Sequence, residues 1–199
     1  MQRIGIFSGT FDPIHKGHLA FALQAIAVAK LDKVFFMLEA KPRRKEGITH
    51  YSHRLAMLRL ALKPYRKLDI LEVPDKQFSV NKTMPRLLSI LKDDQLFLLL
   101  GSDAVQYICN LDDWPNAGAM LKKFGLVIGL RGGGDKKTVL KSLSQVGQEI
   151  SELEIIDSTH QHASSKNIRE GIGSGKKPED LLKGISDYVD QHWLYQTVA

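Results

Sequence analysis

The chain has 199 residues, 43% of them hydrophobic and 25% charged, a balance that is typical of globular proteins and argues against long disorder. No apolar stretch approaches the length of a membrane span, and the single cysteine, Cys109, excludes an internal disulfide and a cysteine metal cluster. An apolar run that starts almost at once leaves no room for a signal peptide, so we expect a cytoplasmic protein without a membrane partner. The net charge of +6 suits a nucleic-acid binder and an enzyme for phosphorylated small molecules equally.

Apolar runs that end in turn residues predict strands, and apolar residues with a helical period predict helices. In chain order we expect a strand at Arg3–Phe7, a helix from Gly17 to Ala29, a strand at Lys33–Leu38, a helix at Tyr51–Leu62, a strand in "LDILEV" (68–73), a helix in "KTMPRLLSILK" (82–92) and a strand at Gln95–Leu100. The later elements are strands at Phe124–Leu130 and Leu153–Asp157, a helix in "SSKNIREGI" (164–172) and one or two helices in residues 178–195.

The alternation of strands and helices predicts an α/β fold, with a mainly parallel sheet, right-handed crossovers and helices on both faces. We find no repeat and no clear domain boundary, so we expect residues 1–199 to form a single Rossmann-like, doubly wound domain. Residues 158–199 would supply a small C-terminal helical extension of that same domain. The segment "RGGGDKK" (131–137) is predicted to be a mobile loop.

Four unusual segments follow predicted strands, at the edge where an open parallel sheet binds its ligands. They are Gly9–His18 after the first strand, Lys41–Lys45 after the second, Gly101–Asp103 after the fourth and Ser164–Arg169 after the sixth. We therefore expect the fold to gather several of them along one edge of the sheet.

The first of these segments, "GTFDPIHKGHL", joins a strand to a helix. Gly9 allows close backbone approach, and the first amides of the helix favour an anion. His15 and His18 would lie on one face of the helix start and could donate hydrogen bonds to phosphate oxygens that gain charge in a transition state. A metal site with Asp12 as the nearest acidic partner, and a purely structural role for the histidines, stay open as alternatives.

The same stretch resembles the H-x-G-H motif of the nucleotidyltransferase superfamily, and "SSKNIR" (164–169) resembles its second motif, usually S-S-T-x-I-R. The segment "GSDAVQYICNLDDW" (101–114) resembles the G-x-D and tryptophan segment of nicotinate-nucleotide adenylyltransferases. "HRLAMLRLAL" (53–62) is similar to the helix that follows their basic loop. The resemblance extends over residues 4–172, and the two end motifs are specific in combination.

This resemblance implies an adenylyltransferase of NAD biosynthesis. The 5′-phosphate of a pyridine mononucleotide would attack the α-phosphorus of ATP in line, and pyrophosphate would leave without a covalent enzyme intermediate. The implied cofactor is Mg²⁺, held mainly by the phosphates and not by protein ligands. The implied partners are ATP and a phosphorylated small-molecule acceptor, without nucleic acid, and the sequence leaves open whether the chain forms a homo-oligomer.

The resemblance also implies which residues act. His15 and His18 would be catalytic by holding the α- and β-phosphate oxygens, and Arg169 by gripping the β- and γ-phosphates. Asp103 would contact the ribose or help to place the metal. The full set of implied ATP-binding residues is Gly9, Thr10, Phe11, Gly17, Gly101, Asp103, Ser164, Ser165 and Ile168, the last packing beneath the others.

The implied acceptor-binding residues are Arg44, Asn81, Thr83 and Trp114, with Trp114 stacking on the pyridine ring and Arg43 and Lys45 adding phosphate contacts. The chain departs from the family in this half. The usual Tyr-Thr pair with a second threonine is "QFSVNKT" (77–83) here, and the usual Arg-Pro-Gly after the fifth strand is "RGGG" (131–134). Lys166 also replaces the threonine of the second motif.

The acceptor is therefore the open point. Nicotinate mononucleotide is favoured, because the helix start at Ser79–Thr83 with Lys82 suits a carboxylate. Nicotinamide mononucleotide is the alternative, because Asn81 could pair with an amide. Another phosphorylated acceptor, or a non-catalytic nucleotide-binding relative, stays open as well.

More distant alternatives lack their own motifs. Enzymes of this superfamily that use phosphopantetheine as the acceptor have another residue in place of the first histidine of H-x-G-H. Cytidylyltransferases carry R-T-x-G-I-S-T-T, and class I aminoacyl-tRNA synthetases carry K-M-S-K-S. None of these patterns occurs in the chain.

Overall fold

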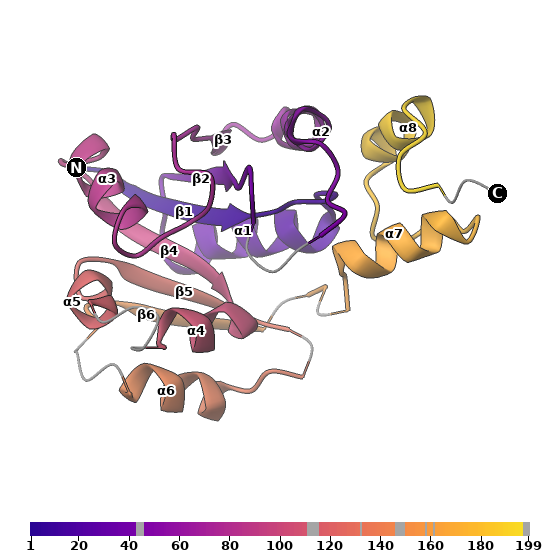
Figure 1. The fold of residues 1–199 in the computed structure, drawn as a ribbon. Helices are drawn as coiled ribbons and strands as arrows, with labels where there is room; N and C mark the ends of the chain where they lie inside the picture. The colour runs from indigo at the N-terminus through magenta and orange to yellow at the C-terminus, as the bar shows by residue number, and fades with distance from the viewer. Residues whose placement is uncertain are drawn as a thin grey trace.

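The computed structural model describes residues 1–42, 46–110, 116–131, 133–145, 150–157, 159–160 and 162–196. Within these residues six strands form one sheet in the order β3-β2-β1-β4-β5-β6, and every pair of neighbours is parallel (Figure 1). The strands are β1 (Arg3–Gly9), β2 (Lys33–Leu38), β3 (Leu68–Ile70), β4 (Gln95–Gly101), β5 (Gly125–Leu130) and β6 (Leu153–Asp157). The predicted parallel α/β sheet is confirmed.

Helices cover both faces of this sheet. They are α1 (Lys16–Val28), α2 (Tyr51–Leu62), α3 (Thr83–Ile90), α4 (Ser102–Ile108), α5 (Ala117–Leu121), α6 (Lys136–Ser144), α7 (Ser165–Gly173) and α8 (Lys183–Gln191). One hydrophobic core joins α1, α2, α7 and α8 to one face, with Phe21, Met57 and Ile168 among its buried side chains. A second hydrophobic core joins the helices α3, α4, α5 and α6 to the other face, with Met84 and Val105 among its buried side chains. The chain is therefore doubly wound, as the sequence predicted.

The short elements differ most from the sequence prediction. Strand β3 ends at Ile70 because it is the edge strand and pairs with β2 over three residues only. Helices α4, α5 and α6 were not predicted. The predicted loop at residues 131–137 ends inside α6, because Asp135 caps that helix by accepting a hydrogen bond from the Thr138 amide at 2.9 Å.

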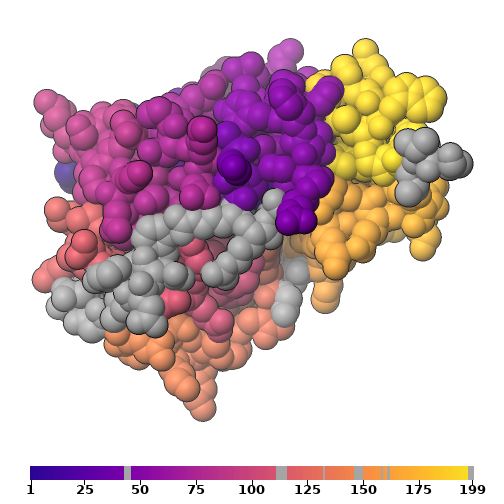
Figure 2. Space-filling view, in the orientation of Figure 1, coloured from indigo at the N-terminus to yellow at the C-terminus, as the bar shows by residue number. Residues whose placement is uncertain are grey.

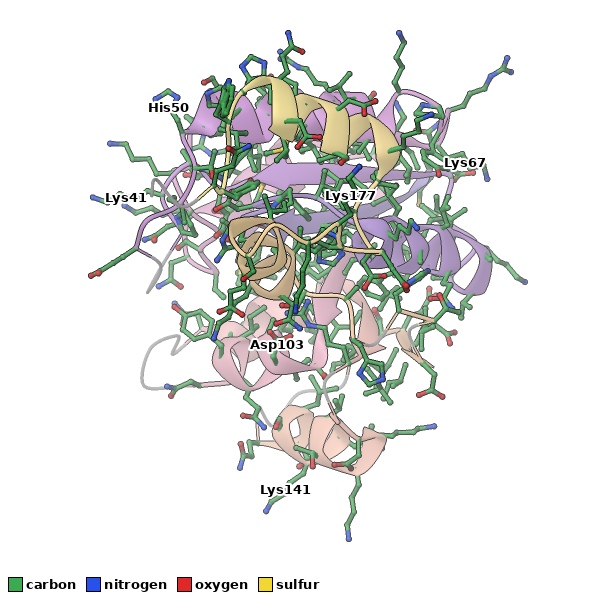
Figure 3. The ribbon with its side chains drawn as sticks, turned by 90° about the vertical axis from the view of Figure 1, so that its right-hand side faces the viewer. Lys41, His50, Lys67, Asp103, Lys141 and Lys177 are labelled. Atoms are coloured by element: carbon green, nitrogen blue, oxygen red, sulfur yellow. The ribbon has the colours of Figure 1, made fainter. Side chains whose placement is uncertain are left out.

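All the strands of the sheet end on the side where α7 and α8 lie (Figure 1). Figure 3 looks onto this edge, with Asp103 labelled near its centre, below α7. None of the helices in the described part of the chain is long and apolar enough to cross a membrane.

Candidate active site

A cavity of about 810 Å³ opens at the carboxyl edge of the sheet. This volume falls within the range of small-molecule sites. The segments after β1, β2, β4 and β5 and the start of α7 form its walls. The lining residues that the sequence analysis had singled out are Gly9, Thr10, Phe11, His15, Gly17, His18, Gly101, Asp103, Ser164, Ser165 and Arg169. The fold thus brings both motifs and the segment after β4 to one cavity.

Ile168, on α7, is buried in the hydrophobic core and does not line the cavity. The residues after β2 that were expected to bind phosphate, Arg43, Arg44 and Lys45, lie outside the described residues, and so does Trp114.

The structure does not bring Asn81 and Thr83 to the cavity. Thr83 is the first residue of α3 and is fully buried, and its hydroxyl accepts a hydrogen bond from the Ser79 amide at 3.0 Å. This threonine therefore organises the turn before α3. Asn81 is exposed, and the residue of this loop that lines the cavity is Phe78.

His15 lies at the entrance to α1 with only 2% of its surface exposed. Neither ring nitrogen has a hydrogen-bond partner among the described residues. Burial, together with the positive charge of Arg131, lowers the pKa of His15 to about 4, so the ring is neutral at neutral pH. A buried imidazole that lines a cavity without a protein partner is suited to donate a hydrogen bond to a ligand.

His18 stacks on His15 with the ring centroids 3.7 Å apart, and the ring of Phe11 meets it edge-on at 5.0 Å. The Nδ1 atom of His18 accepts a hydrogen bond from the His15 amide at 3.3 Å. A neutral His18 ring therefore carries its proton on Nε2, the nitrogen that can donate. The two imidazoles form one stacked pair with a set orientation.

The glycines of the first motif make room for these rings. A Cβ atom on Gly17 would lie 2.9 Å from the Cβ of Ala163 and 3.1 Å from the His15 ring. A Cβ atom on Gly9 would lie 2.9 Å from the ring of Phe11, a residue with a φ of 44°. A phenylalanine held in this left-handed conformation is strained, and such strain is common at functional sites.

The amides at the start of α1 behave differently from the prediction. The Lys16 amide donates to the Asp180 carbonyl at 3.0 Å, and the His18 amide donates to the His15 carbonyl at 3.1 Å. These two N–H groups are used inside the protein and are not free to bind an anion.

The second motif is tied to the loop of the first. Ser164 caps α7 by accepting from the Asn167 amide at 3.2 Å. The Ser165 hydroxyl donates to the carbonyl of Pro13 at 3.0 Å, and Nη1 of Arg169 donates to the carbonyl of Asp12 at 2.6 Å. Arg169 therefore lines the cavity from a fixed position beside the histidines.

The sequence analysis missed Arg54, the largest fully buried side chain among the described residues. Its guanidinium donates to the carbonyls of Thr10 and Glu39 at 2.8 and 2.9 Å, and also to those of Thr49 and Ala40. It thereby joins the loops that follow β1 and β2. Burial lowers its pKa, and the charge of Asp12 acts in the opposite direction.

The sequence does carry a signal for Arg54. Met57, Leu58 and Ala61 follow it at three, four and seven residues, which places the arginine on the buried stripe of α2.

Glu39 and Arg131 also line the cavity, although neither was predicted as a site residue from the sequence. Glu39 accepts hydrogen bonds from the Phe78 amide at 3.0 Å and from the Ser8 hydroxyl at 3.2 Å. Arg131, at the end of β5, forms an exposed ion pair with Asp103 at 2.9 Å. The cavity thus has a cationic group from α7, Arg169, and another from the end of β5, Arg131. On the β2 side it has the carboxylate of Glu39.

The donor groups around the cavity do not form a metal cage. Among the described residues no three histidine, cysteine or carboxylate side chains gather in a way that could hold a metal ion. The carboxylate of Asp12 already accepts from Tyr195 and Thr49, and Asp103 is paired with Arg131. This arrangement fits a divalent ion that enters with nucleotide phosphates and keeps its own waters.

Comparisons with known proteins agree with this geometry. Residues 6–171 match the family model described as cytidylyltransferase-like. The nicotinate-nucleotide adenylyltransferase of Bacillus subtilis is 33% identical, with 99% of this chain and 100% of the relative covered. A Clostridium perfringens protein described as a probable nicotinate-nucleotide adenylyltransferase is 32% identical over 98% of this chain and 99% of its own.

Solved structures show the same fold. Nicotinic acid mononucleotide adenylyltransferase of Plasmodium falciparum, in complexes with APC and with NaAD, superimposes with TM-scores of 0.77 and 0.78. The sequence identities are 16% and 17%, and 98% of each chain is covered. The chain therefore belongs to the cytidylyltransferase-like family and, within it, to the nicotinate-nucleotide adenylyltransferases.

Proposed function

We propose that this enzyme joins the 5′-phosphate of nicotinate mononucleotide to the adenylyl group of ATP, and that it releases pyrophosphate. The observation that carries the chemistry is the stacked pair of His15 and His18 in the cavity. His15 is a buried neutral imidazole with no protein hydrogen-bond partner among the described residues. Arg169 lines the same cavity and adds a positive charge.

In this reaction an oxygen of the acceptor's 5′-phosphate forms a bond to the α-phosphorus of ATP. The bond between that phosphorus and the oxygen bridging to the β-phosphate breaks, and the electron pair leaves with pyrophosphate. The protein's task is to position both nucleotides and to stabilise the charge that builds up on the phosphate oxygens. His15 and His18 donate to the α- and β-phosphate oxygens, and Arg169 holds the β- and γ-phosphates.

A divalent metal ion, which we take to be Mg²⁺, would neutralise the phosphate charge as part of the bound nucleotide. Asp103 is an exposed carboxylate that lines the cavity, and its Arg131 partner would offer a second cation to the departing pyrophosphate. The remaining contacts to the phosphates come from Ser164 and Ser165 at the start of α7.

The acceptor would lie on the β2 side of the cavity, against Phe78 and Glu39. In this proposal Arg44 also contacts the acceptor, and Trp114 stacks on its pyridine ring. The relatives named for nicotinate nucleotides support the acid form of the acceptor.

Competition between the two pyridine mononucleotides tests the acceptor. Nicotinate and nicotinamide mononucleotides are supplied together at equal concentration with ATP and Mg²⁺, and the two dinucleotide products are separated and quantified. We expect nicotinate adenine dinucleotide to dominate by about tenfold or more, the scale of one additional charge-assisted hydrogen bond.

A preference for the nicotinamide form would contradict nicotinate mononucleotide as the acceptor while leaving adenylyl transfer intact. Absence of both products, with pyrophosphate released on another phosphorylated acceptor, would contradict the pyridine assignment.

A further inference from the structure

The last described residues of the chain reach back to the first motif. After α8 the backbone turns sharply, with φ values of 53° at Trp193 and 64° at Tyr195. The hydroxyl of Tyr195 then donates to Oδ1 of Asp12 at 2.7 Å, across 183 positions of sequence. In Figure 2 the C-terminal residues, in yellow, lie against α2, in violet, and beside α7, in orange.

Asp12 is the point where four distant segments meet. Its side chain is 2% exposed, Oδ1 accepts from Tyr195, and Oδ2 accepts from the Thr49 amide at 3.2 Å. The guanidinium of Arg169 lies 4.0 Å from Oδ2 while it donates to the main-chain carbonyl of Asp12 at 2.6 Å. Arg169 is therefore held by the backbone of Asp12 and not by a close ion pair with its carboxylate.

We propose that Tyr195 is a positioning residue that keeps Arg169 directed at the nucleotide phosphates. The inference rests on the proposed function, because it needs Arg169 as a phosphate ligand. The Tyr195 hydroxyl satisfies Oδ1 of Asp12, so the carboxylate does not draw the guanidinium onto itself. The C-terminal end of the chain thereby completes the ATP site.

The consequence of losing this hydroxyl follows from the contacts. With phenylalanine at position 195, Oδ1 of Asp12 is buried without its donor, which is costly. Arg169 is the cation that already lies 4.0 Å away, so it is the group that can move to satisfy the carboxylate. That movement would draw the Arg169 guanidinium away from the phosphates of the bound nucleotide.

The phenol is suited to this task because it keeps its proton. Burial and the neighbouring carboxylate of Asp12 both raise the pKa of Tyr195, so it stays a hydrogen-bond donor through the working pH range.

Tyr188 provides a matched control. It lies on α8, and its hydroxyl is 2.9 Å from Nδ1 of His53 on α2. Tyr188→Phe removes a hydroxyl of the same kind from the same C-terminal part of the chain, but the partner that this hydroxyl loses is His53 and not Asp12.

The test is a double-mutant cycle on nucleotide affinity. A non-hydrolysable ATP analogue with Mg²⁺ is titrated by calorimetry into the wild type, Tyr195→Phe, Arg169→Ala, the double variant and Tyr188→Phe, and the melting temperature of each is recorded. We expect Tyr195→Phe to weaken binding about five- to twentyfold in the wild-type background and less than twofold in the Arg169→Ala background. Tyr188→Phe should change the affinity less than twofold. It should lower the melting temperature by about as much as Tyr195→Phe does.

Two results would show that Tyr195 only stabilises the fold and would overturn the proposal. One is that Tyr195→Phe weakens binding of the analogue equally in the wild-type and Arg169→Ala backgrounds. The other is that Tyr188→Phe weakens binding as much as Tyr195→Phe does. A wild type that does not bind the analogue would overturn the ATP site and this inference together. A wild type that binds the analogue but makes no dinucleotide would contradict the proposed function alone, and the cycle would still decide the role of Tyr195.

Steady-state kinetics provides an independent readout. Tyr195→Phe should raise the KM for ATP with little change in the KM for the acceptor, and an increase confined to the acceptor would contradict the proposal.

Discussion

At the scale of single residues, the site depends on where protons lie on two histidines. His15 is neutral because it is buried beside a positive charge, and His18 presents a donor because its Nδ1 is occupied by the His15 amide. A preorganised donor forms a stronger hydrogen bond to phosphate oxygens as they become more negative in the transition state. The sequence predicted both residues, but the burial of His15 and the hydrogen bond to Nδ1 of His18 come from the fold.

The depressed pKa of His15 makes a prediction about stability. The unfolded ring takes up a proton near pH 6.5 and the folded ring only near pH 4, so the unfolded state binds more protons between these values. The contribution of His15 to the free energy of unfolding therefore falls as the pH falls, by about 2 kcal/mol between pH 7 and pH 5.

Urea unfolding of the wild type and of His15→Asn at both pH values measures this difference. The variant should lose about 2 kcal/mol less on acidification, whereas His162→Asn, at an exposed position, should behave as the wild type. An identical acid loss in His15→Asn would rule out a buried neutral ring at this position.

At the scale of elements, the two motifs meet through contacts that sequence patterns could not predict. Period and composition predicted all six strands, the helices of one face and α3 on the other face. They did not predict α4, α5 or α6, which have seven, five and nine residues. They also misplaced Thr83, whose hydroxyl is used by the backbone of its own turn.

Gly17 tests the contact between the motifs. Alanine there would bring a Cβ to 2.9 Å from Ala163 and 3.1 Å from the His15 ring, so Gly17→Ala should destabilise the protein by about 1–3 kcal/mol and reduce turnover. Gly184 occupies the equivalent second position of α8, where an added Cβ meets nothing within 4 Å.

Gly184→Ala should therefore stabilise the protein by about 0.5–1 kcal/mol without affecting turnover. Thermal melts and initial rates of both variants decide the matter. Equal tolerance of alanine at the two positions would show that the motifs are not in tight contact.

At the scale of the whole molecule, the fold explains why residues far apart in the sequence act together. The ends of parallel strands meet at one edge, and α7 and the C-terminal segment close that edge against the loop after β1. Parallel-sheet topology made the convergence of strand ends predictable from sequence. The participation of Arg54 and Tyr195 was not predictable to the same degree, because each acts through main-chain or carboxylate oxygens that only tertiary packing brings within reach.

The most direct test of adenylyl transfer at this cavity follows the fate of labelled phosphate. ATP labelled at the α- or γ-phosphate is incubated with nicotinate mononucleotide, Mg²⁺ and either the wild type or His18→Ala. The α label should enter the dinucleotide and the γ label should enter pyrophosphate. His18→Ala should lower turnover roughly a hundredfold, with a nearly unchanged melting temperature, because the ring acts on developing charge. Label released as inorganic phosphate, or a His18→Ala enzyme with near-normal turnover, would contradict this assignment of the site.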